Sequence, residues 1–389
     1  CWVVGPNPVG EWRGQANAIA GWTQGGWRFL APRIGSAVLR GGDALPARYN
    51  GARWVVGEVR ASGVVFTSGG TEADNLAVKG LALGRPRGRH IVVSAVEHEA
   101  VLRSVDYLRR LHDFEVSVVP VDGDGRVSVE SVESAVRPDT TLVSVMHANN
   151  EIGTLQPLAG ISRVAHAVGA LVHTDAVQSV GQLDTRLAAL GVDALSFSGH
   201  KIGAPKGTGA LVLRGRFDLE PLVHGGGQEN GRRSGTESVA GAVALATALE
   251  LAEAERAASA RSDGARSDGE RSGIRDAFVA AVLAGTPGAR LTGHVTERLP
   301  GNASFVFDAI DGEAVLLELE RRGVISSSGS ACAAGRSDAS HVLLAIGLTQ
   351  EAARSAVRFS WDRGTTGSQL AEVAAAVADA VESVRALGR

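Results

Sequence analysis

The chain of 389 residues carries 39 lysines and arginines against 42 aspartates and glutamates, which gives a formal net charge of −3. This balance excludes a strong electrostatic attraction to nucleic acid or to an anionic membrane surface. No apolar run approaches the roughly 20 residues that a membrane-spanning helix needs. The two cysteines, Cys1 and Cys332, are too few for a disulfide framework and indicate a reducing, cytoplasmic setting.

Residues 1–51 differ in character from the rest of the chain. Four of the six tryptophans lie in this segment, and neither a helical nor a strand period persists through it. We interpret the abrupt change near Ala52 as a shifted reading frame or a truncated start, and we treat residues 1–51 as an atypical N-terminal segment.

Residues 52–258 alternate between short apolar runs and amphipathic helical patterns. Helical stretches such as 99–111 and 158–168 separate several of these runs, which are HIVVS, FEVSVVP, TLVSVMH, ALVHTD, DALSFS and GALVLR. Strands that alternate with helices predict a large α/β domain around a mostly parallel sheet. In such sheets, ligands bind at the carboxyl ends of the strands.

The tetrad Arg-Ser-Asp-Gly occurs twice between residues 261 and 269, and its glycines disfavour a continuous helix. We therefore predict a linker over residues 259–273. Residues 274–389 return to mixed helix and strand, with NASFVFD as a strand and 368–387 as an amphipathic closing helix. They form a smaller C-terminal domain.

Polar residues follow several of the predicted strands. Gly70 and Thr71 come after VVFT, where glycine lets backbone N–H groups turn toward an anion such as phosphate, although such turns are also ordinary helix caps. Asp175 ends ALVHTD, where a buried carboxylate needs a cationic partner or else caps the next helix. His98 and Asn150 follow two further strands and are, taken singly, ordinary structural residues.

Lys201 follows the run DALSFS. Burial there would lower the pKa of its amine and suit it to Schiff-base chemistry, although most lysines are solvated surface charges. Taken together, an anion cradle, a histidine, a carboxylate and a lysine at one sheet edge are what pyridoxal 5'-phosphate (PLP) requires of a protein.

Cys332 lies in the stretch ISSSGSACAAGRS, residues 325–337, where the neighbouring residues are small. The composition predicts a mobile loop rather than a packed core position, which would let a thiol travel.

Six segments occur in a fixed order from about Ala52 to the C-terminus: FTSGGTEADNLAVKG, NNEIGTLQP, HTDAVQSVG, SFSGHKIGAPKGTGAL, HGGGQENGRRSGTESV and SSSGSAC. Together they resemble the motif set of the cysteine desulfurases, which are fold-type I, PLP-dependent enzymes of the class V aminotransferase group. The resemblance implies a large domain with a mostly parallel seven-stranded sheet and a smaller α+β C-terminal domain. The family's ATTP-like and GNPSS segments have no counterpart in residues 1–51.

The resemblance also implies a role for each matching residue. Lys201 would bind the cofactor covalently and shuttle the substrate α-proton, Asp175 would pair with the ring nitrogen, and His98 would stack on the ring and help to move protons. Gln178 would bind the ring hydroxyl, and Asn150 would contact cofactor and substrate. The phosphate site would consist of Gly70, Thr71, Ser198, His200 and, from the partner subunit, Thr236.

Two further residues would handle the substrate. Arg358 would bind its carboxylate, for which a planar guanidinium is suited. Cys332 would attack the substrate sulfur and keep it as a persulfide, while L-alanine leaves. The segment after Cys332 resembles the subgroup that serves iron–sulfur cluster assembly and tRNA thiolation. We expect no resident metal site, although Cys332 could ligate an iron–sulfur cluster transiently.

The resemblance implies L-cysteine as substrate, a homodimer, and an iron–sulfur scaffold protein or another sulfur acceptor as partner. Two alternatives stay open. One is a selenocysteine lyase or a related PLP-dependent C–S lyase, although the Gly-Ser-Ala-Cys motif favours persulfide chemistry over simple elimination. The other is an inactive homologue that acts as a scaffold, which the atypical N-terminal segment leaves possible.

Overall fold

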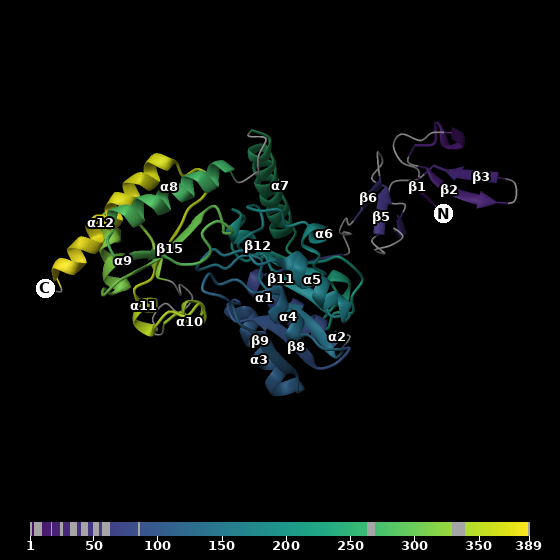
Figure 1. Ribbon diagram of the computed structural model, residues 1–389. Helices are drawn as coiled ribbons and strands as arrows, with labels where there is room; N and C mark the ends of the chain where they lie inside the picture. Colours follow the sequence, from purple (N-terminus) through teal and green to yellow (C-terminus); the bar gives the residue numbers. More distant parts are fainter. Residues whose placement is uncertain are drawn as a thin grey trace. The chain divides into compact units, whose positions relative to one another are not determined.

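The structure is a computed structural model, and it describes residues 2–3, 10–16, 18–23, 26–31, 37–39, 46–49, 54–56, 63–84, 86–262, 269–328 and 339–387. The chain divides into two compact units, Cys1–Gly63 and Val64–Arg389 (Figure 1). Among the described residues, no helix is both long and apolar enough to cross a membrane.

The first unit contains two small antiparallel sheets. Their strands are β1 (Trp2–Val3), β2 (Ile19–Thr23) and β3 (Gly26–Leu30) in one sheet, and β4 (Ala37–Leu39), β5 (Pro46–Tyr49) and β6 (Trp54–Val56) in the other, with the short helix η1 (Gly10–Trp12) before β2. Ala18 and Ala20 form a small buried cluster against Trp12 and Phe29, whose rings meet edge to face at 6.2 Å. Strands therefore form where the sequence pattern predicts no regular element.

A seven-stranded sheet forms the centre of the second unit. Its spatial order is β7 (Val64–Thr67), β13 (Gly209–Leu213), β12 (Ala194–Ser198), β11 (Leu171–Asp175), β10 (Thr140–Ser144), β8 (His90–Ser94) and β9 (Glu115–Val119). The pairs from β12 to β9 are parallel, and β13 runs antiparallel to both of its neighbours. The predicted mostly parallel sheet is confirmed. Strands β8, β10 and β12 are buried along their whole length, as apolar runs covered on both faces should be.

Helices connect and cover these strands. They are α1 (Gly70–Asn75), the π-helix η3 (Leu76–Gly80), α2 (Leu81–Gly84), α3 (Glu99–His112), α4 (Val129–Ala135), α5 (Leu158–Ala167), α6 (Leu187–Leu190), η4 (Gly199–Lys201), η5 (Glu229–Gly231) and α7 (Val239–Ser262). The predicted helix over 99–111 matches α3. The His98 ring caps the N-terminus of this helix by accepting a hydrogen bond from the Ala100 N–H at 3.1 Å.

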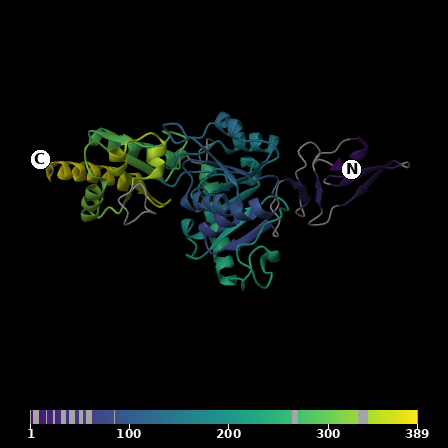
Figure 2. The same cartoon turned by 90° about the horizontal axis from the view of Figure 1, so that it is seen from below.

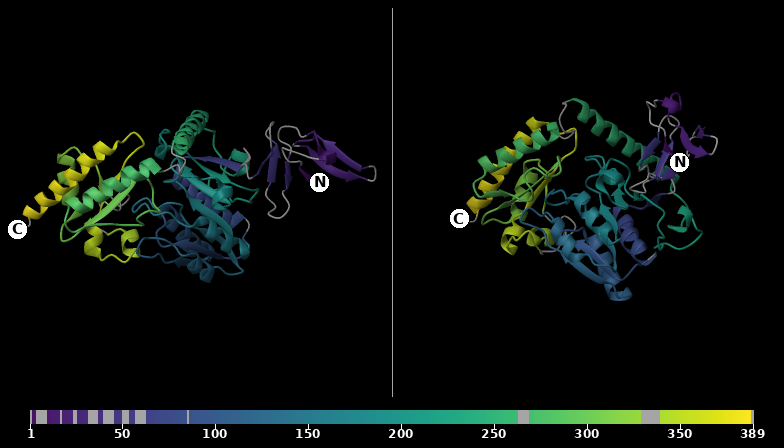
Figure 3. Two further views of the ribbon diagram at one scale, coloured as in Figure 1. Left: turned by 45° about the horizontal axis from the view of Figure 1, so that its top comes forward. Right: turned by 45° about the vertical axis from the view of Figure 1, so that its right-hand side comes forward.

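A second, antiparallel sheet lies in the C-terminal part of this unit, in the order β14 (Ala289–Leu291), β15 (Asn302–Phe307), β17 (Val357–Ser360), β16 (Ser327–Ser328). The accompanying helices are α8 (Gly269–Gly285), α9 (Gly312–Arg321), α10 (His341–Ala345), α11 (Gln350–Arg354) and α12 (Gly367–Leu387). Phe278 on α8 packs edge to face on Phe305 and Phe359 at 5.9 and 5.5 Å between ring centroids. These segments gather in one lobe (Figure 2), and α12 lies along α8 (Figure 3).

Helix extends into both ends of the segment predicted as a linker. Helix α7 continues to Ser262 and α8 begins at Gly269, so residues 259–262 and 269–273 are helical. Residues 263–268 lie outside the described part of the chain.

Candidate active site

A cavity of about 1010 Å³ opens at the carboxyl ends of β8, β10, β11 and β12. Residues of the C-terminal part between 299 and 302 and between 358 and 364 also line it. Ten of the predicted site residues line this cavity: Gly70, Thr71, His98, Asn150, Asp175, Gln178, Ser198, His200, Lys201 and Arg358. Thr236 is exposed and is not among the lining residues, and Cys332 lies outside the described residues.

The N-terminus of α1 forms one end of the pocket. Residue Gly69 precedes it with φ 151° and offers no side-chain cap, so the positive end of the continuous helical run 70–84 is open to an anion. A Cβ at Gly70 would stand 2.7 Å from Val177 Cγ2 and 3.3 Å from Ser198 Cβ, so this cradle requires glycine. The Ser198 hydroxyl and His200 Nδ1 are hydrogen-bonded at 2.7 Å beside it. Glycine backbone, hydroxyl and helix end together fit a phosphate group.

Asp175 ends β11 and is only 5% exposed. Its Oδ1 accepts a hydrogen bond from the Val177 N–H at 2.8 Å. Burial raises the pKa of this carboxyl group, whereas the Val177 N–H and the neighbouring His98 and Lys201 oppose the rise. A buried carboxylate of this kind is stabilised by a further cation in the pocket, and the protonated ring nitrogen of PLP would be such a cation.

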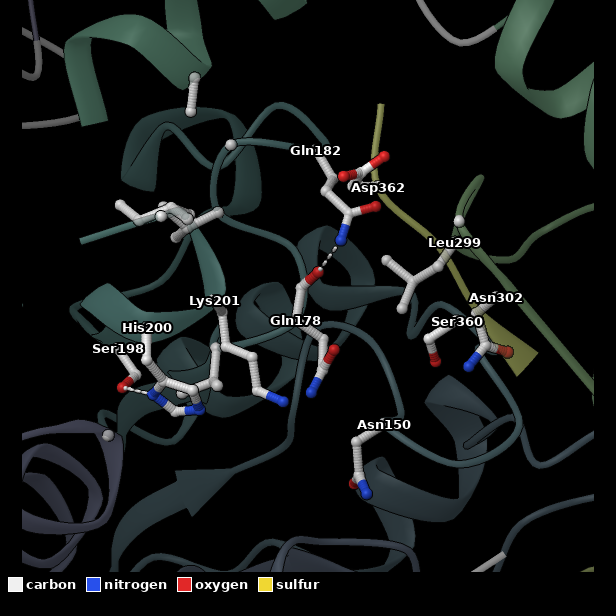
Figure 4. Close-up of a pocket in the computed structure, with 18 of the residues that line it drawn as sticks. Asn150, Gln178, Gln182, Ser198, His200, Lys201, Leu299, Asn302, Ser360 and Asp362 are labelled. Atoms are coloured by element: carbon white, nitrogen blue, oxygen red, sulfur yellow. Dashed lines mark hydrogen bonds between the residues drawn. The ribbon is translucent and has the colours of Figure 1, made fainter. Parts of the chain in front are cut away.

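Lys201 ends η4 beside the cavity. In Figure 4 its amine and the side-chain amide of Gln178 project into the same part of the pocket, above Asn150. The side chain is exposed, because it lines a wide, open cavity, so the predicted burial of this lysine is wrong. The position of Lys201 at a strand end was predictable from the sequence; the width of the cavity was not.

Arg358 reaches the pocket from β17 of the second sheet. Its Nη1 donates to the backbone carbonyl of Asn150 at 2.9 Å, which joins β17 to the turn after β10. This contact places a guanidinium group in the lining of the same pocket as Lys201, where it can bind a carboxylate.

Sequence reasoning missed several lining residues. Asp74 lines the cavity and is 1% exposed, and its only sequence signal is that it lies one helical turn after Gly70. Gln182, Asn302 and Trp361 also line the cavity, and no local pattern marks them, because the fold brings them together from distant segments.

Comparisons with known proteins identify the family and the fold of the chain. The family described as "Aminotransferase class-V" matches residues 46–373, and a family described as "Protein of unknown function (DUF2793)" matches residues 1–55. A cysteine desulfurase of Cereibacter sphaeroides is 41% identical over 365 residues, covering 92% of both chains. Among solved structures, a NifS-like protein has a TM-score of 0.73 at 34% identity, covering 83% of each chain. The structure titled "SspA in complex with cysteine" has a TM-score of 0.65 at 35% identity, covering 77% of this chain and 81% of the other.

The sheet order and the pocket at its carboxyl edge define a PLP-type α/β transferase fold, and the predicted fold class is confirmed. The chain belongs to the class-V aminotransferase family and, within it, to the cysteine desulfurases. This family implies a PLP cofactor. The match of residues 1–55 to a family of their own argues against a shifted reading frame there, because a shifted frame yields no family pattern.

Proposed function

We propose that this chain removes sulfur from L-cysteine, releases L-alanine, and carries the sulfur as a persulfide on Cys332. The observation that supports it most is the convergence, in one cavity, of Lys201, Asp175 and the open N-terminus of α1. Membership of the cysteine desulfurases supports the same reaction.

The described residues of the pocket fit PLP, and we propose that they hold it. The cradle at Gly70 with Ser198 and His200 would take the phosphate, joined by the Thr71 hydroxyl. Asp175 would pair with the ring nitrogen, Gln178 would bind the ring hydroxyl, and His98 would stack on the ring. When bound, PLP supplies an electron sink for bonds to the substrate α-carbon.

The remaining pocket residues would position the substrate and move its protons. The Arg358 guanidinium would bind the carboxylate of L-cysteine, with Asn150 beside it. The Lys201 amine would hold the cofactor covalently and, once the substrate has displaced it, would move the α-proton. His98 would hold a proton near the reacting sulfur.

The sulfur step would use Cys332 as nucleophile. Its thiolate would attack the substrate Sγ, a new S–S bond would form, and the Cβ–S bond would break. The electron pair of that bond would stay with the carbon, which takes up a proton and leaves as L-alanine. The sulfur atom is thereby retained on Cys332, from which an iron–sulfur scaffold protein or another acceptor would collect it; the low cysteine content supports a reducing, cytoplasmic setting for this exchange.

A homodimer would complete the phosphate site with Thr236 from the partner subunit. Thr236 is exposed and lies off the pocket of its own chain. Helix α7, which follows it, exposes Val239, Val243 and Leu251 at 70%, 61% and 60%. Three exposed aliphatic side chains on one helix support a partner surface there.

The substitution V243E should therefore shift the chain from dimer to monomer in sedimentation and weaken PLP binding. A wild-type chain that sediments as a monomer would contradict the proposed dimer.

Borohydride reduction tests the proposed cofactor linkage. The purified protein should be yellow, and reduction should fix the colour on a peptide that contains Lys201. A colourless wild-type protein that takes up no added PLP would favour the inactive scaffold instead.

The two cysteines offer a matched pair of variants. After incubation with sulfur-labelled L-cysteine, wild type and C1A should carry reductant-labile label, and C332A should carry none while it keeps bound PLP. If C332A, with dithiothreitol added as the reductant, still forms L-alanine and free sulfide as fast as wild type, the chain is a C–S lyase without a persulfide carrier.

A further inference from the structure

Asp74 lines the pocket next to Asp175, the carboxylate that would face the cofactor ring. It stands one turn after Gly70 on α1, so both residues share the helix face that lines the cavity. One carboxylate oxygen of Asp74, one of Asp175 and a ring nitrogen of His98 lie within 4.8 Å of one another. Both carboxyl groups are almost fully buried, with 1% and 5% of their surface exposed.

Two carboxylates this close in a buried site do not both ionise, because repulsion adds to the cost of desolvation. A third, Glu97, is fully buried nearby and also raises the pKa of Asp74. The basic groups that face this cluster are His98 and Lys201, and both lower the pKa of Asp175. Burial raises the pKa of Glu97 to about 8, so that group holds a proton of its own, and burial with repulsion favours a further proton on the pair of Asp74 and Asp175.

The hydrogen-bond donors around Asp74 and Asp175 indicate which of these two carboxyl groups holds the proton. Asp175 accepts the Val177 N–H at 2.8 Å. Asp74 Oδ1 has no hydrogen-bond donor among the described residues, and the nearest ring nitrogen, His173 Nε2, stands 3.8 Å away. That imidazole is buried between Ser144 and Ser196 at 2.9 Å from each, and burial lowers its pKa to about 3, so it carries no positive charge. Burial, followed by the charge of Asp175, raises the pKa of Asp74 well above its ordinary value, and the Ser196 hydroxyl opposes this rise only in part.

We propose that Asp74 is a positioning residue that carries a proton and donates a hydrogen bond to Asp175. Asp74 thereby fixes the orientation of the carboxylate that pairs with the ring nitrogen, without placing a second negative charge below it. This role rests on the proposed PLP site, but its first test does not need the cofactor.

Infrared difference spectra of the cofactor-free protein test the protonation of Asp74. At about pH 7, wild type minus D74N should show the C=O stretching band of a protonated carboxyl group. E133Q is the control, because Glu133 is an exposed carboxylate on α4 and wild type minus E133Q should show no such band. A spectrum without that band means an ionised Asp74 and overturns the proposal, whatever the protein does with L-cysteine.

PLP binding tests the hydrogen bond. D74N keeps a donor of the same shape and should bind PLP as wild type does, whereas D74L has none and should bind about tenfold more weakly. The visible band of bound PLP should titrate at the same pH in wild type and D74N. If D74N binds as weakly as D74L, or D74L as tightly as wild type, Asp74 does not act through a donated hydrogen bond. A wild-type protein that binds no PLP would instead contradict the proposed function, and the infrared result would stand.

Discussion

At the scale of single residues, burial decides the charge of several carboxyl groups around the pocket. Glu151, in the turn after β10, is 5% exposed and accepts a hydrogen bond from the Ser340 hydroxyl at 2.5 Å. Burial raises the pKa of this carboxyl group to about 7, although Ser340 and Arg358 oppose the rise. The contact joins Ser340, which caps α10, to the turn that also carries Asn150. Glu151 therefore connects the turn after β10 to the start of α10 through a group that titrates near neutrality.

The substitution E151Q should make the unfolding free energy less dependent on pH. A carboxyl group whose pKa is raised on folding stabilises the folded state most below its ordinary value of 4.5, and this contribution is lost as pH rises toward 7. The unfolding free energy of E151Q relative to wild type should thus rise by about 2 to 3 kcal/mol between about pH 5 and pH 8.

Urea denaturation of the cofactor-free proteins at both pH values measures this difference. E133Q, at an exposed position of α4, is the control and should track wild type. A constant gap between E151Q and wild type would mean that Glu151 ionises as freely in the folded chain as in the unfolded one.

At the scale of elements, β13 and the turn before α1 approach each other closely. A Cβ at Gly209, the first residue of β13, would lie 2.6 Å from the backbone carbon of Gly69 and 2.8 Å from the Phe197 carbonyl oxygen. Both neighbours are backbone, so neither can move aside as a side-chain tip can. The close packing of β13 against the turn at Gly69 therefore requires glycine at position 209 and also fixes the position of the anion cradle that follows this turn.

The substitution G209A should lower the unfolding free energy by about 1 to 3 kcal/mol, because an added methyl group must displace backbone. It should also weaken PLP binding, since the displaced backbone is the turn at Gly69. G123A is the control: its Cβ would meet nothing within 4 Å, so we expect a change within about 0.5 kcal/mol. Urea denaturation and PLP titration measure both effects. If G209A binds PLP with wild-type affinity, the added methyl group on β13 does not displace the turn at Gly69.

Elements of the sheet could be predicted from the sequence to the extent that local patterns specify them. The fully buried strands appear in the sequence as unbroken apolar runs. Ligands bind at the carboxyl ends of such strands, so the residues that follow the runs, Gly70, Asp175 and Lys201, could be placed at one edge of the sheet from the sequence alone. The approach of Gly209 to Gly69 and the contribution of Asp74 depend on tertiary contacts that no local pattern encodes. Arg358 was predictable only through family resemblance, because it reaches the pocket from a different sheet.

At the scale of the whole molecule, the chain combines two units that match different families. The first unit, Cys1–Gly63, falls largely within the match to the DUF2793 family and has its own small cluster around Ala18 and Ala20. The second unit contains both larger sheets, the pocket and separate hydrophobic clusters, one around β7–β13 and another around β15 and β17. The residues that we assign to cofactor and substrate all belong to the second unit.

A chain that lacks residues 1–60 should therefore keep the fold and the cofactor of the second unit. Its hydrophobic clusters are formed by residues within Val64–Arg389, so the thermal midpoint of the PLP-bound form should stay within about 3 °C of the full chain. PLP affinity should also be unchanged, because every lining residue of the pocket is retained. Calorimetry and PLP titration of both chains measure this. Loss of PLP binding at an unchanged midpoint would show that the first unit helps to enclose the pocket, and loss of folding would show that the two units are one cooperative structure.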